Sequence, residues 1–242
     1  MGKKYKTTYQ IPFYESDINQ NVKLPHILSV ALQVSGMQSL ELGMSDEKIF
    51  KDYHLVWVIT DYEIEMERLP RYAETVTIET EALSYNRYFC YRSFAIYSQE
   101  GQKIMTILST FVLSDYDSRK VHEVVEAIIR PYASEKIKKI NRGPKYHKLA
   151  DPQETLYHVR YFDLDLNGHV NNSRYIEWMY DVLELDFLKT HIPRKISLKY
   201  VKEVHHGKDV LSRLEQSGLI TRHEIVSQGQ LNAQASIEWR RL

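Results

Sequence analysis

Two stretches of the chain carry hydrophobic residues at helical spacing, and strand-like runs make up most of the remainder. In the first stretch the apolar positions recur every three or four residues, at Leu24, Ile27, Leu28, Ala31 and Val34. This spacing predicts a helix, for which Pro25 suits the first turn and Gly43 marks the end. The second stretch, VNNSRYIEWMYDVLELDFL, predicts another helix from residue 170 onward.

Strand-like runs surround each helix. A short helix is expected after Ser45, and four runs follow it: HLVWVITDYEIEME, ETVTIETEALSYN, RYFCYRSFAIYS and QKIMTILSTFVLSD. Four more follow the second long helix: RKISLKYVKEV, KDVLSRLEQSG, LITRHEIVSQ and LNAQASIEWRRL. One further strand is expected before each long helix, within residues 5–14 and 155–169. Each half of the chain therefore predicts one long helix and several antiparallel strands.

The two halves are also related as an internal repeat. Residues of one polar segment recur after 148 positions, since Asp17, Asn19, Asn21 and Val22 correspond to Asp165, Asn167, His169 and Val170. We therefore assign residues 1–121 to a first repeat and residues 155–242 to a second. Between them, residues 122–154 are expected to form a helix and a linker, because this stretch is rich in lysine and contains Gly143-Pro144 and Asp151-Pro152.

Both long helices are apolar nearly all round, which predicts that they are buried. The first adds Met37, Leu40 and Leu42, and the second carries Tyr175, Trp178, Met179, Val182, Leu183 and Leu185. A lone apolar helix beside one curved sheet is expected to be wrapped by it, and two such units can join edge to edge, which hides strand edges. The predicted fold class is α+β: two tandem repeats, each with a long helix wrapped by a curved antiparallel sheet.

Composition excludes several classes of function. Lys and Arg total 32 and are matched by 32 Asp and Glu, so no overall field favours nucleic acid or anionic lipid. The start, MGKKYKTTYQIPF, has no apolar core of a signal peptide, and no run approaches the roughly 18 apolar residues of a membrane span. Cys90 is the only cysteine, so no intrachain disulfide can form and a cytoplasmic location is expected.

A polar turn beginning YFDLDLNGH lies just before the second helix. Alternate side chains of an extended segment share one face, so Asp165, Asn167 and His169 are expected to point the same way. Gly168 permits a tight turn, and the helix can then be capped by one of the next polar residues, Asn171, Asn172 or Ser173. An imidazole that titrates near neutral pH would thus lie beside helix amides able to hold an oxyanion.

The same turn has three other interpretations. DLDLNG copies the first half of an EF-hand loop, but the twelfth position is Arg174 instead of an acid. A purely structural turn would have Asp and Asn satisfy their own backbone, with His169 merely packed. The repeat argues against it, because the first copy holds Asn21 at the titratable position. A zinc site would lack ligands, since the sequence has no cysteine pair and no HExxH motif.

The sequence also argues against a catalytic serine or cysteine nucleophile. No G-x-S-x-G elbow is present. Cys90 falls within a strand-like run of the first repeat, where a packed thiol is the simpler interpretation.

The segment DLDLNGHVNNSRYIEW, followed about thirty residues later by SLKYVKEV, resembles the acyl-acyl-carrier-protein (acyl-ACP) thioesterases of plants and bacteria. The likeness extends over essentially the whole chain and includes EAIIRPY near the end of the first half and the ending IEWRRL. It implies a double hotdog fold and hydrolysis of fatty acyl-ACP to free fatty acid, which ends chain elongation.

The resemblance assigns catalytic roles to Asp165, Asn167 and His169, and it places the family's catalytic acid on Glu203. The next position, a cysteine once proposed as nucleophile in plant members, is Val204 here. Water is therefore the implied nucleophile.

In the implied mechanism, His169 and Glu203 activate water, and either can serve as the base. Asn167 holds the water or the thioester carbonyl, and Asp165 fixes Asn167 or the start of the helix. The oxyanion is expected to bind backbone amides at the helix start, namely those of Val170, Asn171 and Asn172.

The first repeat holds Leu69 near the position of Glu203, so it lacks the catalytic set. The family's chain-length selection is attributed to this half, and an apolar slot is expected along the first helix. The candidate wall residues are Met37, Leu40, Trp57 and Ile59.

Acyl carrier protein, which is acidic and bears its acyl chain on phosphopantetheine, is the implied partner. The stretch from Arg130 to Lys148 has seven Lys or Arg against one acid, Glu135, and could steer such a partner. A solvated linker is the alternative interpretation. No metal or organic cofactor is implied, and either a monomer or a homodimer fits.

Two other functions stay open from sequence alone. The first is an acyl-CoA thioesterase of the same fold, because thioester chemistry does not reveal the carrier. The second is a non-catalytic acyl-binding module, which would bind without turnover. The complete polar set in one repeat speaks against it.

Overall fold

The computed structural model describes residues 2–141, 143–166 and 168–242. The first half begins with β1 (Lys4–Gln10), a 3-10 turn η1 (Phe13–Glu15), the long helix α1 (Leu24–Glu41) and the short helix α2 (Asp46–Tyr53). Its remaining strands are β2 (Leu55–Met66), β3 (Thr75–Tyr85), β4 (Phe89–Tyr97), β5 (Lys103–Asp115) and β6 (Val121–His122). The short helix expected after Ser45 is confirmed, with the Ser45 hydroxyl accepting a hydrogen bond from the Lys48 amide.

The second half repeats this order with shorter helices. It consists of β8 (Gln153–His158), η3 (Tyr161–Asp163), α4 (Asn172–Asp181), α5 (Leu185–Thr190), β9 (His191–Tyr200), β10 (Asp209–Ser217), β11 (Ile220–Ser227) and β12 (Gln230–Arg241). The segment between the halves contains α3 (Glu126–Ile129), η2 (Arg130–Tyr132) and the two-residue β7 (Glu135–Lys136), which pairs with β3.

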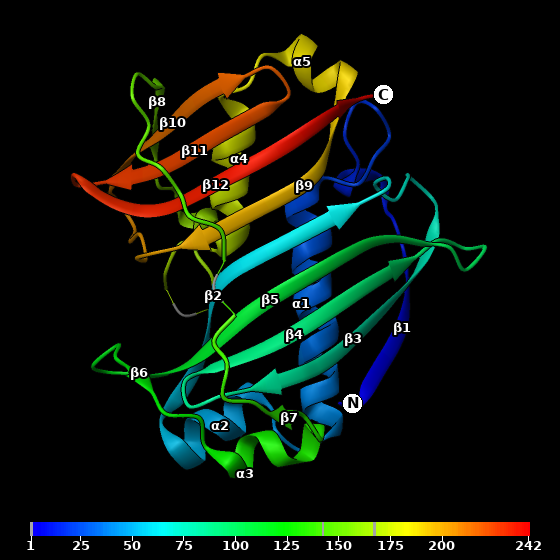
Figure 1. The fold of residues 1–242 in the computed structure, drawn as a ribbon, viewed down its shortest axis with the longest axis vertical. Coiled ribbons are helices and arrows are strands. Elements are labelled where there is room, and N and C mark those ends of the chain that lie inside the picture. The colour runs from blue at the N-terminus through cyan, green and yellow to red at the C-terminus, as the bar shows by residue number, and fades with distance from the viewer. Residues whose placement is uncertain (1, 142, 167) are drawn as a thin grey trace.

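One continuous sheet runs through both halves. Its strand order is β1-β3-β4-β5-β2-β9-β12-β11-β10-β8, so β2 and β9 join the two repeats edge to edge. Figure 1 shows this sheet with α1 behind its lower part and α4 behind its upper part. The predicted α+β fold of two helices wrapped by antiparallel strands is therefore confirmed.

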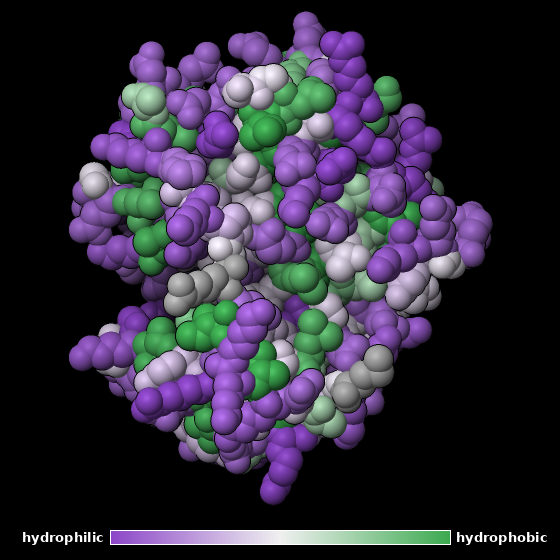
Figure 2. All heavy atoms as spheres, viewed as in Figure 1, coloured by the Kyte–Doolittle hydropathy of each residue, from purple (hydrophilic) through white to green (hydrophobic). Residues whose placement is uncertain are grey.

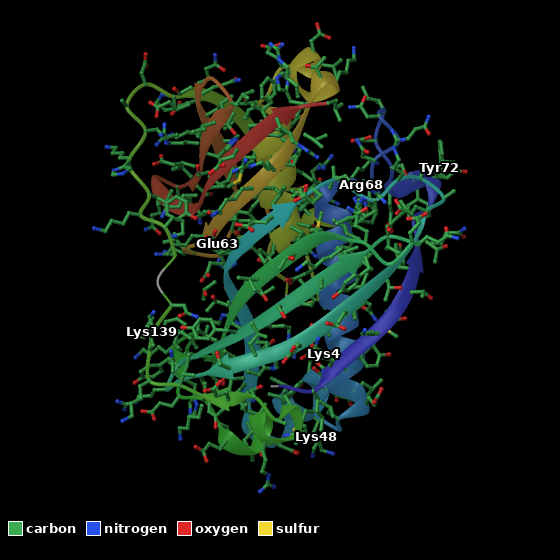
Figure 3. The ribbon with its side chains drawn as sticks, turned by 45° about the vertical axis from the view of Figure 1, so that its right-hand side comes forward. Lys4, Lys48, Glu63, Arg68, Tyr72 and Lys139 are labelled. Atoms are coloured by element: carbon green, nitrogen blue, oxygen red, sulfur yellow. The ribbon has the colours of Figure 1, made fainter. Side chains whose placement is uncertain are left out.

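The junction between β2 and β9 is held by side chains as well as by the ladder. Ser197 donates a hydrogen bond to Glu63 at 2.6 Å, and Lys195 lies 3.3 Å from Glu65. Figure 3 places Glu63 on this central seam of the molecule. Pairing the two edges removes open strand edges at this point of each half.

The buried apolar side chains of helix α1 end at Val34. Leu24, Ile27 and Ala31 are almost fully buried, as predicted. Near the end the pattern is inverted, because Gln38 is 2% exposed whereas Leu40 is 70% exposed. Gln38 can be buried because its side chain donates to the Lys3 carbonyl and accepts from Arg92.

The second helix differs from the prediction in length. The apolar run 170–188 folds as two helices, α4 and α5, with a turn at residues 182–184. Tyr175, Trp178 and Met179 are buried against the sheet, but Leu185 is 58% exposed at the start of α5. The break at the buried Leu183 turns the chain away from the core, so the expectation of one long buried helix was wrong here.

Hydrophilic side chains predominate on the face of the sheet shown in Figure 2, and the surface is hollowed at the left, between the two halves. The β5–β6 turn lies at this same edge in Figure 1. No helix within the described ranges 2–141, 143–166 and 168–242 is long and apolar enough to cross a membrane.

Candidate active site

The polar turn before α4 is a small closed loop. The Asp165 amide donates to the His169 carbonyl at 2.8 Å, and the Gly168 amide donates to the Asp165 carbonyl at 3.0 Å. Gly168 has φ +77°, a conformation that glycine adopts without strain. An Asp165 carboxylate oxygen lies 3.3 Å from the His169 amide, which helps to hold the turn. Asn167, the third predicted catalytic residue of this turn, lies outside the described residues.

Most amides at the start of α4 already have partners. The Val170 amide donates to the Val204 carbonyl, the Asn171 amide to the Asp163 carbonyl and the Ser173 amide to the Asn171 side chain. The prediction that the Val170 and Asn171 amides bind an oxyanion was therefore wrong. The chain folds back on itself here to cap the helix, so these amides are already hydrogen-bonded.

The Asn172 amide differs from its neighbours. It makes no hydrogen bond to any of the described residues, and Asn172 lines the cavity described below. The residue is held in place through its carbonyl, which accepts a hydrogen bond from the Tyr200 hydroxyl at 2.9 Å. Among the described residues, it is the one predicted oxyanion donor whose N–H is not already paired.

Glu203 lies three residues beyond the end of β9, in a segment fixed from both sides. The Asn232 side-chain amide donates to the carbonyls of Lys202 and Glu203 at 3.1 and 3.3 Å. The Val204 amide donates to the Tyr175 hydroxyl at 3.0 Å. These contacts with β12 and α4 hold the backbone around Glu203 in place and leave its carboxyl group available for other contacts.

His169 and Glu203 meet, although 34 residues separate them in the chain. The His169 Nε2 atom lies 3.3 Å from Glu203 Oε2, with side-chain exposures of 19% and 35%. The His205 ring contacts the His169 ring edge-on, with centroids 5.1 Å apart. The two side chains therefore form a partly buried pair in which a proton can pass between the imidazole and the carboxylate.

Sequence reasoning missed a third member of this cluster, Arg119. Its guanidinium forms an ion pair with the other carboxylate oxygen of Glu203, Oε1. Arg119 belongs to the β5–β6 turn of the first half and has φ +56°. Nothing in the local sequence SDYDSRKV marks it, because the contact forms only when the two halves join.

The pair opens onto a cavity of about 270 Å³ that both halves line. Asp165, His169, Asn172 and Glu203 lie at the second-half side. Most of the rest comes from α1 and β2 to β5, with contributions from α2, α3 and η2. A volume near the lower end of the roughly 300–1,000 Å³ typical of small-molecule pockets suits a slender ligand.

Two of the four predicted wall residues line this cavity, namely Trp57 and Ile59. Met37 and Leu40 do not, since they lie on the outward face of α1 with exposures of 38% and 70%. The helix instead presents Leu32 and three small residues to the cavity, namely Ser35, Gly36 and Ser39. Small residues leave space for a ligand beside the helix, whereas the prediction had selected wall residues by their hydrophobicity.

The part of the cavity near α2 and α3 is polar. Arg92 donates from Nη1 to Gln38 and Thr80, and its guanidinium lies 5.4 Å from the Tyr132 ring centre. Burial lowers the pKa of Arg92 to about 10, so the group is charged at neutral pH. Burial raises the pKa of the nearby Cys90 thiol to about 12, which supports the prediction of a packed thiol.

The first half contains the same turn without the reactive groups. Asn21 pairs with Arg71 as His169 pairs with His205, and the Val22 amide donates to Pro70 as the Val170 amide donates to Val204. Leu69, at the place of Glu203, is buried. Only the second half therefore carries an acid–base pair at this position.

Within the described ranges, no group of three or more His, Cys, Asp or Glu side chains lies close enough to hold a metal ion. The arrangement is that of a proton-transfer site beside a narrow cavity.

Comparison with known proteins agrees with this geometry. The acyl-ACP thioesterase N-terminal domain matches residues 2–132, and the C-terminal domain of the same family matches residues 146–241. The oleoyl-acyl carrier protein thioesterase of Coriandrum sativum is 27% identical in an alignment 231 positions long, which covers 88% of this chain and 62% of that protein. The chain thus spans about three fifths of the length of this plant relative.

Solved structures extend the comparison. A putative oleoyl thioesterase from Lactobacillus plantarum is 32% identical and superposes with a TM-score of 0.94 over 100% of this chain and 97% of its own. The 12:0-ACP thioesterase of Umbellularia californica, at 20% identity, shares the fold with a TM-score of 0.86 over 99% of this chain and 98% of its own. The chain belongs to the acyl-ACP thioesterase family.

Proposed function

We propose that the protein hydrolyses the thioester of fatty acyl-ACP, releasing free fatty acid and carrier protein. The observation that carries this proposal is the His169–Glu203 pair, which opens onto a narrow cavity running along α1. The family and the names of its relatives support the choice of an acyl thioester as substrate.

Water is the nucleophile in this proposal. One member of the His169–Glu203 pair accepts a proton as the water oxygen attacks the thioester carbonyl carbon. The carbon–sulfur bond then breaks, and the pair returns the proton to the leaving thiolate. Val204 is buried beside Glu203 and offers no nucleophile, and Cys90 is held as a thiol.

The negative charge that develops on the carbonyl oxygen needs a donor. The Asn172 amide suits this role because it is at the start of α4, where the helix dipole favours negative charge. Asp165 supports the same turn through the His169 amide. We assign Asn167 the role of holding the water or the carbonyl, on the basis of the family motif alone.

The two halves divide the work in this proposal. Residues 1–121 supply most of the acyl cavity, and residues 155–242 supply the acid–base pair and the oxyanion donor. Residues 122–154 connect them and pack against the first half through the pairing of β7 with β3. The β5–β6 turn brings a first-half charge, Arg119, to the reacting groups.

The carrier is tested by comparing dodecanoyl-ACP with dodecanoyl-CoA at equal concentrations. The proposal expects a higher kcat/KM with the ACP substrate. A preference for the CoA thioester would reject the carrier assignment and leave thioester hydrolysis in place.

Arg119→Ala is expected to lower kcat about tenfold, or about 1.4 kcal/mol in activation free energy. Without the guanidinium, the Glu203 carboxylate is no longer held toward His169. Arg119→Lys keeps the charge and is expected to recover part of the loss. Steady-state kinetics with acyl-ACP measure both, and unchanged kcat in Arg119→Ala would show that the ion pair does not position the carboxylate.

The basic linker gives a second test. Lys138 and Lys139 are exposed, and Figure 3 shows Lys139 on the outer edge of the linker beside the lower half. The double variant Lys138→Glu/Lys139→Glu is expected to raise KM for acyl-ACP about tenfold and weaken its salt dependence, because it repels an acidic carrier. Lys103→Glu, at another exposed lysine at the start of β5, is the control. Equal effects of both variants would remove the linker from carrier recognition.

A further inference from the structure

A second, larger cavity of about 710 Å³ lies apart from the catalytic pair. It is lined by the η1–α1 turn of the first half and by α4, α5, β9 and β12 of the second half. In Figure 1 the blue turn that follows β1 reaches up to this part of the molecule. Asn19 ties the two sides together by donating to the carbonyls of Leu188 and Lys189.

This cavity is the internal-repeat counterpart of the catalytic one. The catalytic cavity combines the turn of the second half with the helix of the first, and the second cavity combines the turn of the first half with the helices of the second. Asn21 and Leu69 line it at the places of His169 and Glu203. Neither side chain can accept a proton near neutral pH, so a ligand here would be bound but not hydrolysed.

The walls of the cavity are mostly apolar and open to solvent on one side. The apolar lining comes from residues of both halves: Phe13, Val22, Leu24, Leu69, Leu185, Leu188, Ile192 and Trp239. Phe13 and Leu185 are 79% and 58% exposed, respectively. Large apolar side chains that gather around one opening typically mark a binding site for an apolar group.

Two buried polar atoms in the lining residues lack partners. The Tyr180 hydroxyl and the His26 Nδ1 atom make no hydrogen bond to any residue that the structure describes. Burial raises the pKa of Tyr180, so its hydroxyl stays protonated, and burial lowers the pKa of His26, so its ring is neutral. An uncharged hydrogen-bonding group of a ligand would satisfy the hydroxyl.

The charges around the cavity select against an anionic head group. Three carboxylates line it, Asp17, Glu177 and Asp181, against one ammonium group, Lys23. The Arg174 guanidinium pairs with Glu177, so Asp17 and Asp181 carry the remaining negative charge. The amides of Asn19 and Asn21 donate to the Asp17 carboxylate and fix it. A free fatty acid would place its carboxylate among these like charges, whereas a thioester or amide head would not.

We propose that this second cavity binds a fatty acyl chain linked to an uncharged head, such as acyl-pantetheine, and holds it without hydrolysis. The choice of an acyl thioester as ligand rests on the proposed function of the catalytic cavity. The apolar walls hold the chain, and the Tyr180 hydroxyl donates to a carbonyl of the head.

The test uses S-dodecylpantetheine, a thioether that cannot be hydrolysed, in calorimetric titrations of the whole protein. Wild type is expected to bind two equivalents. Leu188→Asp, and independently Leu185→Asp at the more exposed site on the same helix, places a charge in the apolar wall and should remove one equivalent. The equivalent that remains reports that these variants are folded. Gly36→Phe, which occupies part of the catalytic cavity, should weaken the other equivalent and leave the second one unchanged.

Tyr180→Phe is expected to weaken the second equivalent about fivefold, as the loss of one hydrogen bond predicts. Dodecanoate, titrated in place of the thioether, should leave the second cavity empty. If dodecanoate fills both sites, the proposal that the second cavity requires an uncharged head group is rejected. If wild type binds a single equivalent that Gly36→Phe weakens and Leu188→Asp does not affect, the second site is rejected.

These outcomes are separable from those of the proposed function. Hydrolysis of dodecanoyl-ACP is measured on the same preparations. Two equivalents of thioether without any hydrolysis would uphold the second site and reject the thioesterase assignment. Hydrolysis of dodecanoyl-ACP together with a single bound equivalent of the thioether would uphold the thioesterase assignment and reject the second site.

Discussion

Glu203→Gln is expected to lower kcat/KM for acyl-ACP by about 10²- to 10⁴-fold, the range typical of general acid–base catalysis. The amide keeps the shape of the side chain and its distance from His169, but it cannot take up a proton from water. The loss should appear in kcat, because the acyl cavity is unchanged and substrate binding persists. Steady-state release of free fatty acid from purified acyl-ACP measures it.

Glu238→Gln is the matched control, because Glu238 is also a second-half carboxylate facing an arginine, with Arg194 Nη2 at 3.6 Å. It does not line the catalytic cavity, so its kcat should stay within about twofold of wild type, in line with small effects at surface ion pairs. Near-wild-type activity of Glu203→Gln would remove the carboxylate from the mechanism.

Gly36→Phe is expected to shorten the acyl chains that the enzyme accepts. The ideal Cβ position of Gly36 meets no atom within 4 Å, and the residue lines the catalytic cavity, so a large side chain there occupies space for the acyl chain. Displacing about three methylene groups at about 0.8 kcal/mol each lowers kcat/KM about 50-fold for the longest accepted chain. Chains several carbons shorter should lose much less. A series of acyl-ACP substrates of increasing length measures the shift.

Gly36→Ala separates this effect from a change in the helix. Alanine adds one methyl group in open space and removes the cost of glycine within a helix, about 0.5–1 kcal/mol. It should raise the unfolding temperature and leave the chain-length profile nearly unchanged. An identical loss at every chain length in Gly36→Phe would show that the acyl chain does not pass along α1.

The elements and the repeat could be predicted from sequence because they depend on local patterns. The helical spacing from Leu24 to Val34 and the strand-like runs describe which side of each element faces the core. The pairing of His169 with Glu203 followed from the family resemblance, and the structure confirms that the two meet. The 148-residue spacing of the polar turns is confirmed by their matching backbone hydrogen bonds.

The errors came from contacts that hydrophobicity does not encode. Met37 and Leu40 were assigned to the acyl cavity for being apolar, but the neighbouring small residues at Ser35 and Gly36 create its space. The buried Gln38 shows the same inversion, since a hydrogen bond to Arg92 compensates its polarity. The packing of α1 against the sheet determines which residues of the helix face the cavity.

Arg119 could not be found for a related reason. It lies 84 residues before Glu203 in the chain, within a turn that has no motif. The amides of Val170 and Asn171 were expected to be free because helix starts usually leave donors unpaired. Here the folded-back turn pairs them, which no local pattern of residues reveals.

The most direct test of the central claim compares free fatty acids in cells that express wild type, His169→Ala or the exposed-imidazole control His206→Ala. The account predicts that wild type and His206→Ala release the same defined set of chain lengths, and that His169→Ala, at equal protein level, releases no more than cells without the protein. Release by His169→Ala at the wild-type level would contradict the account, because the imidazole facing Glu203 would then be dispensable.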